Sequence, residues 1–446
     1  MKMDLPLVFT IFGATGDLAT SKIFPGIFNL FCDGIIGDNF KIIGFARRFE
    51  TDKEFRNYLS SYLYGDEQKK IEFLKKVKFC KGDVTNFNDY VKLKEKIQNE
   101  VEIMKTCPSF LYYLSLTPKF YEDVLRNIDK VQLTKICNAP SNWYRIAIEK
   151  PFGESLESDE KIEKLLRKLF VDDQIYRVDH YLGKRILHSL FTFRFSNSIF
   201  DGVWNKNFIE RVELKILETE GVENRVSFYD TVGALRDVGQ NHLLQMLSFV
   251  AMDEPQNFNH EEISREKHKV LKNLNKMNKK DIVKNTIRKQ SKIYSKLVPN
   301  SKTETYFKIL ASINLPRWKG VDFVLEGGKY WKEDRKEIRV IFKNNNLFDK
   351  QKKSPNEIIF QIQPKPKIIT KFYKTESIFN YQLTPYEFEI EEFNDNLYSE
   401  YYFLIYKMMI GERIFFVGND EILEMWKFTD NIIKAWQNNL VPLEYY

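Results

Sequence analysis

Short apolar runs alternate with helix-like patterns of hydrophobic positions over residues 1–150. The first run is Leu7–Phe12, and after a glycine-containing turn Leu18, Ile23, Ile27 and Leu30 recur at helical spacing. Further strand candidates, separated by charged helical stretches, are 41–46, 77–80, 110–116 and 145–148. Strands that alternate with helices predict βαβ units and a parallel sheet.

The pattern changes after residue 180. Helical spacing covers residues 181–193 and 231–252, and the apolar residues of 261–277 fall on one face, which predicts an amphipathic helix. Residues 209–217 alternate as a strand does, and further strand candidates are 307–315, 321–325, 338–342 and 358–363. Because few helices separate these segments, we expect an antiparallel sheet. Residues 413–436 close the chain as a turn followed by a helix.

Length and composition favour a multidomain globular protein. A chain of 446 residues exceeds one ordinary core and predicts two or three domains. The 43% hydrophobic and 29% charged residues are typical of soluble proteins, and no apolar run reaches the ~20 residues of a membrane span. The apolar stretch at the N-terminus runs directly into the glycine turn, which is typical of a first strand and not of a signal peptide. We therefore expect no membrane partner.

Cysteine, histidine and charge exclude several other classes of protein. The four cysteines form no C-x-x-C pair, so they are predicted to be free thiols in a reducing, cytoplasmic compartment. Five histidines leave little material for a zinc site, and no metal is expected. The net charge of +7 is concentrated in residues 265–302, where Tyr294 is the only Phe, Tyr or Trp. A solvated helix face is therefore favoured there over a nucleic-acid site.

The segment Gly13-Ala-Thr-Gly16-Asp17-Leu18 joins the first predicted strand to the first helix. Glycines permit positive φ and close backbone approach, and a helix N-terminus presents N–H groups to an anion. A structural tight turn is the alternative interpretation. The order strand, glycine turn, helix at the start of a βαβ unit favours a site for a dinucleotide pyrophosphate.

The second predicted strand ends at Gly44-Phe-Ala-Arg47-Arg48. Sites specific for NAD usually place an acidic residue at this point to bind the ribose hydroxyls. Two arginines instead suit the 2′-phosphate of NADP, although a solvated basic strand end would look the same. We therefore expect NADP as the cofactor.

Three later segments carry polar groups that a core would not accommodate without partners. They are 148–153 (IEKPFG), 177–184 (RVDHYLGK) and 235–243 (LRDVGQNHL). If 177–184 is helical, His180 and Lys184 are i, i+4 neighbours that could hold an anion, while Asp179 points elsewhere. His242 lies in an apolar helical pattern, where a lone histidine is often a core residue. A carboxylate partner would make it a competent general base.

These motifs resemble those of the glucose-6-phosphate dehydrogenase family. Residues 179–184 match the signature hexapeptide of the family, and 149–153 (EKPFG) and 240–242 (QNH) match two further motifs. Residues 13–19 (GATGDLA), with Lys22 and Pro25, resemble its coenzyme turn. Matches at Phe195-Ser-Asn197, Tyr229-Asp230, Gly411 and Trp426 extend the resemblance over nearly the whole chain.

The resemblance implies an α/β Rossmann-like dinucleotide-binding domain, residues 1–178, and an α+β substrate-binding domain, residues 179–446. The second domain would contain a large, mostly antiparallel sheet used in dimerisation, so a homodimer or homotetramer is expected. The implied reaction is oxidation of D-glucose 6-phosphate at C1 to 6-phospho-D-glucono-1,5-lactone with NADP⁺, the entry step of the pentose phosphate pathway.

The resemblance also implies a role for each matched residue. His242 would be the general base, and Asp179 would stabilise its imidazolium. Predicted substrate contacts are Lys150, His180, Tyr181, Lys184, Glu218, Asp237, Lys329 and Gln363, with the phosphate on His180, Tyr181 and Lys184. Predicted coenzyme contacts are Gly13, Thr15, Gly16, Asp17, Leu18, Arg47, Arg48, Ser115 and Lys150. The Lys150–Pro151 bond would be a mobile, cis-prone hinge.

The chain departs from the family pattern at Arg185, Glu326 and Asp334. Asp334 stands where a second basic substrate contact is usual, five residues after Lys329. Because a carboxylate repels a phosphate, we expect Asp334 to turn away or to pair with a base, while Arg335 or Lys332 supplies the missing charge. Two alternative functions stay open: a broader hexose-6-phosphate dehydrogenase that also uses NAD, and a non-catalytic relative that acts as a binding protein.

Overall fold

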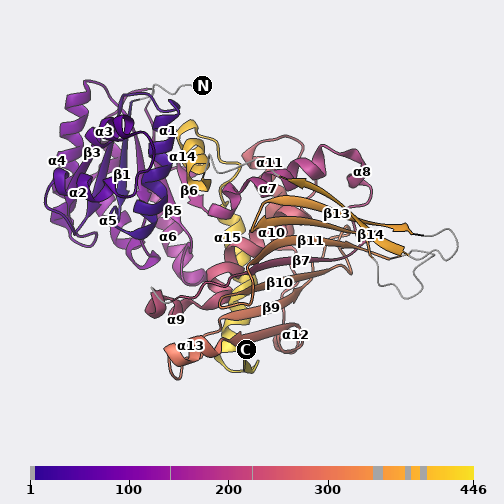
Figure 1. Ribbon diagram of the computed structural model, residues 1–446. Helices are drawn as coiled ribbons and strands as arrows, with labels where there is room; N and C mark the ends of the chain where they lie inside the picture. The colour runs from indigo at the N-terminus through magenta and orange to yellow at the C-terminus, as the bar shows by residue number, and fades with distance from the viewer. Residues whose placement is uncertain (1–5, 141, 223–224, 345–354, 377–382, 392–398) are drawn as a thin grey trace. The chain divides into compact units, whose positions relative to one another are not determined.

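The computed structural model describes residues 6–140, 142–222, 225–344, 355–376, 383–391 and 399–446. The chain forms two compact units, Met1–Gly183 with Asp395–Val417, and Lys184–Asn394 with Gly418–Tyr446 (Figure 1). The predicted functional boundary between residues 178 and 179 stays a prediction. No described helix is both long and apolar enough to cross a membrane.

The first unit contains a six-stranded sheet in which every neighbouring pair is parallel, as predicted. The strand order is β3-β2-β1-β4-β5-β6. The strands are β1 Leu7–Phe12, β2 Phe40–Ala46, β3 Val77–Lys81, β4 Ser109–Leu114, β5 Tyr144–Glu149 and β6 Ile175–Val178. Every residue of β1 and β4 is buried, since helices cover both faces of such a sheet and its strands are continuously apolar.

The helices of the first unit largely follow the βαβ pattern, with one addition. They are α1 Phe24–Cys32, α2 Asp52–Ser60, α3 Glu67–Lys75, α4 Phe87–Met104, α5 Tyr121–Val131, α6 Leu156–Leu169 and α14 Glu400–Ile410. Helix α2 begins at a capping box, in which Thr51 accepts from the Glu54 N–H at 3.2 Å. Helix α14 comes from a distant part of the sequence and packs on α1, where a Cβ at Gly26 would lie 3.2 Å from the backbone of Tyr401.

The second unit contains a nine-stranded sheet of order β14-β13-β12-β11-β7-β10-β9-β8-β15 (Figure 1). Only β7–β10 and β15–β8 are parallel among the described pairs, so the prediction of a mostly antiparallel sheet is confirmed. The strands are β7 Ile209–Leu217, β8 Thr286–Gln290, β9 Tyr306–Ala311, β10 Asp322–Gly328, β11 Arg335–Phe342, β12 Glu357–Gln363, β13 Lys367–Thr375, β14 Leu383–Glu391 and β15 Leu443–Tyr445.

The helices of the second unit include one irregular segment. They are α7 Arg185–Phe195, α8 Ser198–Asp201, α9 Val226–Ala234, α10 Leu244–Ala251, α11 His260–Lys272, α12 Lys279–Asn285, α13 Lys292–Leu297 and α15 Asn419–Gln437. The π-helix η7, Leu235–Leu243, joins α9 to α10, so the predicted helix 231–252 is interrupted by wider turns. The predicted amphipathic helix 261–277 ends early, at Lys272.

The segment that carries the signature hexapeptide is not one α-helix. A 3₁₀ turn, η5 His180–Gly183, ends before Lys184, whose backbone is extended (φ −76°, ψ 127°), and α7 begins at Arg185. The predicted i, i+4 relation of His180 and Lys184 is therefore wrong. The extended backbone of Lys184 separates the 3₁₀ turn from α7, so the two side chains do not share a helical face.

The prediction of four free thiols is wrong for two of them. Cys107 and Cys137 form a disulfide, with Cα atoms 5.8 Å apart. The two residues precede the adjacent strands β4 and β5, so the parallel pairing brings them together although 30 residues separate them in sequence. Cys32 and Cys80 are free, and burial raises the pKa of the Cys80 thiol to about 11.

Candidate active site

In the first unit, most predicted cofactor and substrate residues lie at one edge of the sheet. Gly13, Arg47, Ser115, Lys150 and Asp179 each directly follow a parallel strand, namely β1, β2, β4, β5 and β6. Ligands of open parallel sheets bind at the carboxyl ends of the strands, near the point where the strand order reverses. Here that point lies between β1 and β4, beside Gly13 and Ser115.

Gly13 makes the tightest contact of this edge. Its φ is +76°, and its N–H donates to the Phe45 carbonyl at 2.9 Å. A Cβ on Gly13 would collide with the backbone oxygen of Ser115, which lies on the other side of the reversal point. The Ser115 hydroxyl is buried and has no hydrogen-bond partner among the described residues. The turn therefore leaves a narrow cradle with a spare polar atom, which fits a dinucleotide.

The remaining residues of the turn lead into the first helix. Gly16 and Asp17 are exposed, while Thr15 and Leu18 are half-buried. The N–H of Gly16 donates to the Gly13 carbonyl at 2.9 Å, and the hydroxyl of Ser21 donates to the Asp17 carbonyl at 2.7 Å. The backbone is thus ordered at the start of the helix, where N–H groups favour a pyrophosphate.

The two arginines after β2 differ in surroundings. The Arg47 side chain is 79% exposed, and its guanidinium lies 3.5 Å from the Asp83 carboxylate. It lines a cavity of about 740 Å³ together with Lys81, Lys92 and Lys96. The Arg48 guanidinium instead stacks 4.6 Å from the ring centre of Tyr58. The structure therefore brings Arg47, and not Arg48, to this cavity, which Glu50, Asp83 and Asp89 also line.

Glu149, which precedes Lys150, was not among the predicted site residues. Its carboxylate accepts from the hydroxyls of Tyr113 at 2.6 Å and Tyr401 at 3.1 Å, while the Tyr121 hydroxyl donates to its backbone carbonyl. Burial raises the pKa of Glu149 to about 7, although both tyrosine hydrogen bonds oppose the shift. The Lys150–Pro151 bond that follows is cis. The available signal in the sequence was the place of Glu149 at the start of the EKPFG motif.

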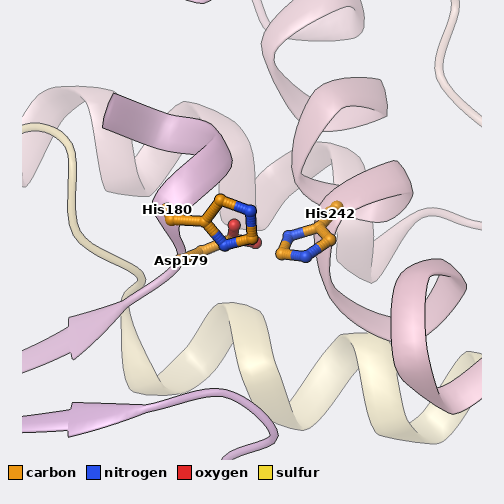
Figure 2. A group of neighbouring side chains, drawn as sticks. All are labelled: Asp179, His180 and His242. Carbon is orange, nitrogen blue, oxygen red and sulfur yellow. The ribbon is translucent and has the colours of Figure 1, made fainter. Parts of the chain in front are cut away.

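Asp179, His180 and Tyr181 share the turn after β6. Asp179 is fully buried, and its Oδ1 accepts from the Tyr181 N–H at 2.9 Å. The His180 ring lies 5.0 Å from that of Tyr181 between centres. Figure 2 shows Asp179 and His180 on this turn, and His242 on a helical segment of the second unit.

The π-helix η7 carries the predicted base. Gln240, Asn241 and His242 are all buried. The Asn241 Oδ1 accepts from the His242 N–H at 2.6 Å, and its Nδ2 donates to the Arg236 carbonyl at 3.0 Å. The amide of Gln240 has no hydrogen-bond partner among the described residues. Short π-helical segments often mark functional sites, because the wider turn re-aims side chains.

Glu218, Asp237 and Lys329 form a buried charged cluster in the second unit. Glu218 follows β7 and Lys329 follows β10, and these two side chains make an ion pair. The Lys329 ammonium also lies 3.8 Å from the Asp237 carboxylate. The structure therefore brings together three residues that the sequence predicted separately. Such a cluster offers carboxylate acceptors to hydroxyl groups and a cation to an anion.

Lys336, at the start of β11, joins this cluster and was missed in the sequence. Its ammonium lies 2.7 Å from the Glu218 carboxylate. Burial alone would raise the pKa of Glu218, but the ammonium groups of Lys329 and Lys336 lower it to about 2. Lys336 is directly opposite Gln363 of β12, another predicted substrate residue. The only signal in the sequence was the two-residue spacing from Asp334.

Of the two alternatives predicted for Asp334, an ion pair with a base is not found among the described residues, and the supply of charge by Arg335 or Lys332 stays a prediction. Asp334 accepts from both the N–H and the hydroxyl of Thr219, each at 3.0 Å, and so bonds to neutral donors and not to a base. Arg335 lies beside the carboxylates of Glu333 and Glu337, at 4.0 and 3.8 Å. Lys184, the last predicted phosphate contact, precedes α7 in the second unit.

Two family models together match almost the whole chain. The glucose-6-phosphate dehydrogenase NAD binding domain matches residues 10–188, and the C-terminal domain of the same family matches residues 191–446. A glucose-6-phosphate 1-dehydrogenase of Borreliella burgdorferi is 38% identical over 451 aligned residues, which cover 96% of this chain and 91% of the relative. That of Cyberlindnera jadinii is 34% identical, over 98% of this chain and 90% of the relative.

Solved structures show the same similarity. A glucose-6-phosphate dehydrogenase in complex with its substrate glucose-6-phosphate superimposes with a TM-score of 0.90 at 30% identity, over 100% of this chain and 95% of that one. The glucose-6-phosphate 1-dehydrogenase of Mycobacterium avium gives a TM-score of 0.84 at 28% identity, over 100% of this chain and 94% of that one.

Proposed function

Because this chain belongs to the glucose-6-phosphate dehydrogenase family, we propose that its chemistry is carried out by His242 and Asp179. The protein oxidises glucose 6-phosphate at C1 to 6-phospho-D-glucono-1,5-lactone, the entry step of the pentose phosphate pathway. NADP, when bound, accepts the hydride that leaves C1.

In this proposal His242 takes the proton of the C1 hydroxyl as the hydride leaves, so that C1 becomes a carbonyl carbon. The imidazole becomes an imidazolium, and the carboxylate of Asp179 stabilises this charge. Two observations support these roles. Asp179 and His242 are both buried, and each is held by a backbone hydrogen bond within its own unit.

For the coenzyme, we propose that the turn after β1 holds the pyrophosphate and that Arg47 binds the 2′-phosphate. Arg48, which stacks on the Tyr58 ring, is the second cation proposed for the 2′-phosphate. The proposed coenzyme contacts are Gly13, Thr15, Gly16, Asp17, Leu18, Arg47, Arg48, Ser115 and Lys150. The cradle at Gly13 and the spare Ser115 hydroxyl support this assignment.

For the substrate, we propose that carboxylates bind the sugar hydroxyls and that cations bind the phosphate. Glu218 and Asp237 accept from hydroxyl groups, and His180, Tyr181 and Lys184 hold the phosphate. Lys150, Lys329 and Gln363 complete the proposed contacts. The observation that carries this assignment is the charged cluster of Glu218, Asp237 and Lys329, because it gathers carboxylate acceptors for hydroxyl groups and a cation for an anion at one place.

We also propose a division of labour between segments and an assembly. Residues 1–178 bind the dinucleotide, and residues 179–446 bind the substrate and form a homodimer or homotetramer through the large sheet. The location is cytoplasmic. Exposed apolar side chains on β13 and β14 support a sheet-mediated contact, since such patches usually mark interfaces.

An absorbance assay at the reduced-nicotinamide band tests the proposal. Purified protein is mixed with glucose 6-phosphate and with NADP or NAD in turn. The His242→Asn variant is the negative control. We expect reduction with NADP that depends on both substrate and His242. Equal rates with other hexose 6-phosphates and with NAD would instead indicate the broader dehydrogenase, and no reduction at all would indicate a binding protein.

A further inference from the structure

The start of β11 presents two opposite charges to the end of β7. Asp334 bonds to Thr219, and Lys336 pairs with Glu218, so both side chains reach the two residues that follow β7. Strand β11 begins at Arg335, so Asp334 immediately precedes it and Lys336 is its second residue. The cation that position 334 lacks is therefore present two residues further along the chain, at the same end of β7.

Lys336 is placed more deeply than a surface lysine. Only 12% of its side chain is exposed, compared with 18% for Glu218 and 8% for Lys329. Lys329 and Lys336 hold different oxygens of the Glu218 carboxylate, Oε2 and Oε1. Two ammonium groups on two oxygens fix both the position of the carboxylate and the plane of its group.

The neighbouring basic residues Arg335 and Lys332 do not lie beside Glu218 as Lys336 does. Arg335 points to Glu333 and Glu337, and 41% of its side chain is exposed. Lys332 is exposed. Register places Lys336 opposite Gln363 on β12 and opposite Ile216 on β7, so it lies between two strands that carry proposed substrate contacts.

We infer that Lys336 is a positioning residue for glucose 6-phosphate, which holds Glu218 ionised and oriented toward a sugar hydroxyl in place of a cation at position 334. The inference rests on the proposed role of Glu218. Without Lys336 the carboxylate would be held from one side by Lys329 alone. It would then bind the sugar less well, and it would become easier to protonate in its buried position.

The test compares Lys336→Ala with four other variants, Lys336→Arg, Lys215→Ala, Glu218→Gln and Arg335→Ala, by steady-state kinetics with each substrate varied in turn. Lys336→Ala should raise the KM for glucose 6-phosphate by about tenfold or more, the usual effect of losing a hydrogen bond to a charged group, while the KM for NADP stays within twofold. Lys336→Arg should keep the native KM within about threefold, because it retains the charge. Lys336→Gln replaces the alanine variant if that one does not fold.

Lys215→Ala is the matched control. Lys215 lies in the same sheet, its side chain is 14% exposed, and its ion pairs among the described residues are with Glu213 at 2.8 Å and Glu326 at 3.9 Å, neither a proposed substrate residue. We expect its KM values to be native. A second readout is the pH profile: Lys336→Ala should show a KM for glucose 6-phosphate that climbs as pH falls, because Glu218 loses one of the cations that hold its pKa down.

Glu218→Gln separates this inference from the proposed function. If Glu218→Gln has a native KM for glucose 6-phosphate, the proposed role of Glu218 is wrong. If Glu218→Gln raises that KM and Lys336→Ala does not, only the inference is overturned. An increase with Arg335→Ala in place of Lys336→Ala, or an equal increase with Lys215→Ala, would overturn it as well.

Discussion

At the scale of single residues, the buried acids of this chain are stabilised in two different ways. Glu218 is held by two ammonium groups, and its pKa is lowered to about 2. Glu149 is held by two tyrosine hydroxyls, which are neutral, and burial raises its pKa to about 7. A cation compensates the loss of hydration of a carboxylate far better than a hydroxyl does. The two acids therefore respond to pH in opposite senses.

Glu149→Gln should remove a pH dependence of stability. The folded pKa of Glu149, about 7, lies above its ordinary value of 4.5. Between these values the folded protein binds the proton and the unfolded chain does not, so stability falls as pH rises from 4.5 to 7, by on the order of 3 kcal/mol. Urea unfolding across pH 4.5–8 should show this slope in the native protein and a shallower one in Glu149→Gln. If the free energy of unfolding of Glu149→Gln changed with pH as steeply as in the native protein, a group other than Glu149 would cause the pH dependence.

His242→Asn should bind substrate and coenzyme but turn over about 10²–10⁴-fold more slowly, the usual contribution of a general base. Asp179→Asn should also be slow, and the pH dependence of its kcat should shift because the imidazolium loses its counter-charge. Isothermal titration measures binding and the absorbance assay measures kcat. A near-native kcat for His242→Asn would contradict the assignment, and lost binding would point to a structural role.

Arg47→Ala should weaken NADP by about 1.5–3 kcal/mol and leave NAD nearly unchanged, because only NADP has the 2′-phosphate. The Arg47/Arg48 double variant should lose more, since Arg48 lies nearby on Tyr58. Fluorescence titration with each reduced coenzyme measures the two affinities. Arg126→Ala is the control, an exposed arginine paired with Glu122 on α5. Equal losses for both coenzymes would show that Arg47 does not read the 2′-phosphate.

At the scale of elements, the turn after β1 depends on a close approach between backbones as well as on a positive φ. Gly13→Ala should weaken NADP and NAD alike and lower stability by more than the ~1–2 kcal/mol of a left-handed alanine, because its Cβ collides with the Ser115 backbone. Gly34→Ala is a matched control: its φ is +67°, and no atom lies within 4 Å of its Cβ. Thermal unfolding with and without coenzyme measures both effects. If Gly13→Ala and Gly34→Ala lowered stability equally, the collision with the Ser115 backbone would contribute nothing to the stability loss.

The elements that the sequence predicted well are those with a strong local pattern. β1 agrees with its predicted run to the residue, because five of its six side chains are apolar and all six residues are buried. Helix α14 was missed because its residues are apolar on nearly every side and show no helical period. β13 and β14 were missed because polar and apolar residues mix in both, β14 at the edge of the sheet and β13 beside it.

The site shows the same limit. Its motif residues could be predicted from their order in the sequence, and Glu218, Asp237 and Lys329 lie together as a substrate pocket requires. Lys336 could not be predicted as a site residue, because its role depends on which strand pairs with β11. The break between His180 and Lys184 could not be predicted either, because it is made by the extended backbone of Lys184 alone.

At the scale of the whole molecule, the edge of the large sheet is unusually apolar for an exposed surface. Phe372, Tyr386, Phe388 and Ile390 are each between 45% and 56% exposed. The register places Tyr386 opposite Phe372, and the alternation of strand β14 puts Phe388 and Ile390 on the same face. The rings of Phe372 and Phe388 lie 6.0 Å apart. We expect this face to be covered by a second copy of the chain.

The double variant Phe388→Glu/Ile390→Glu should shift the assembly toward monomer, because burying two carboxylates in an apolar contact is unfavourable. Sedimentation velocity over a hundredfold range of protein concentration measures the mass. Ile103→Glu is the control, since Ile103 is as exposed as Ile390 but lies on α4 of the first unit. A double variant with the native mass would place the contact on another surface.

The paired placement of Asp334 and Lys336 also bears on how relatives of this chain should be compared. An alignment scores one column at a time, so it records an acid at the first column and treats the lysine at the second as background. In the structure, the side chains at both positions contact the residues that follow β7. The Glu218 carboxylate therefore experiences the sum of their charges. During evolution the basic residue can therefore change from position 334 to position 336 while the pairing of the strands stays the same. Surveys of natural variants should tally charge per strand face, and should look for compensating exchanges between alternate columns before they record a lost ligand.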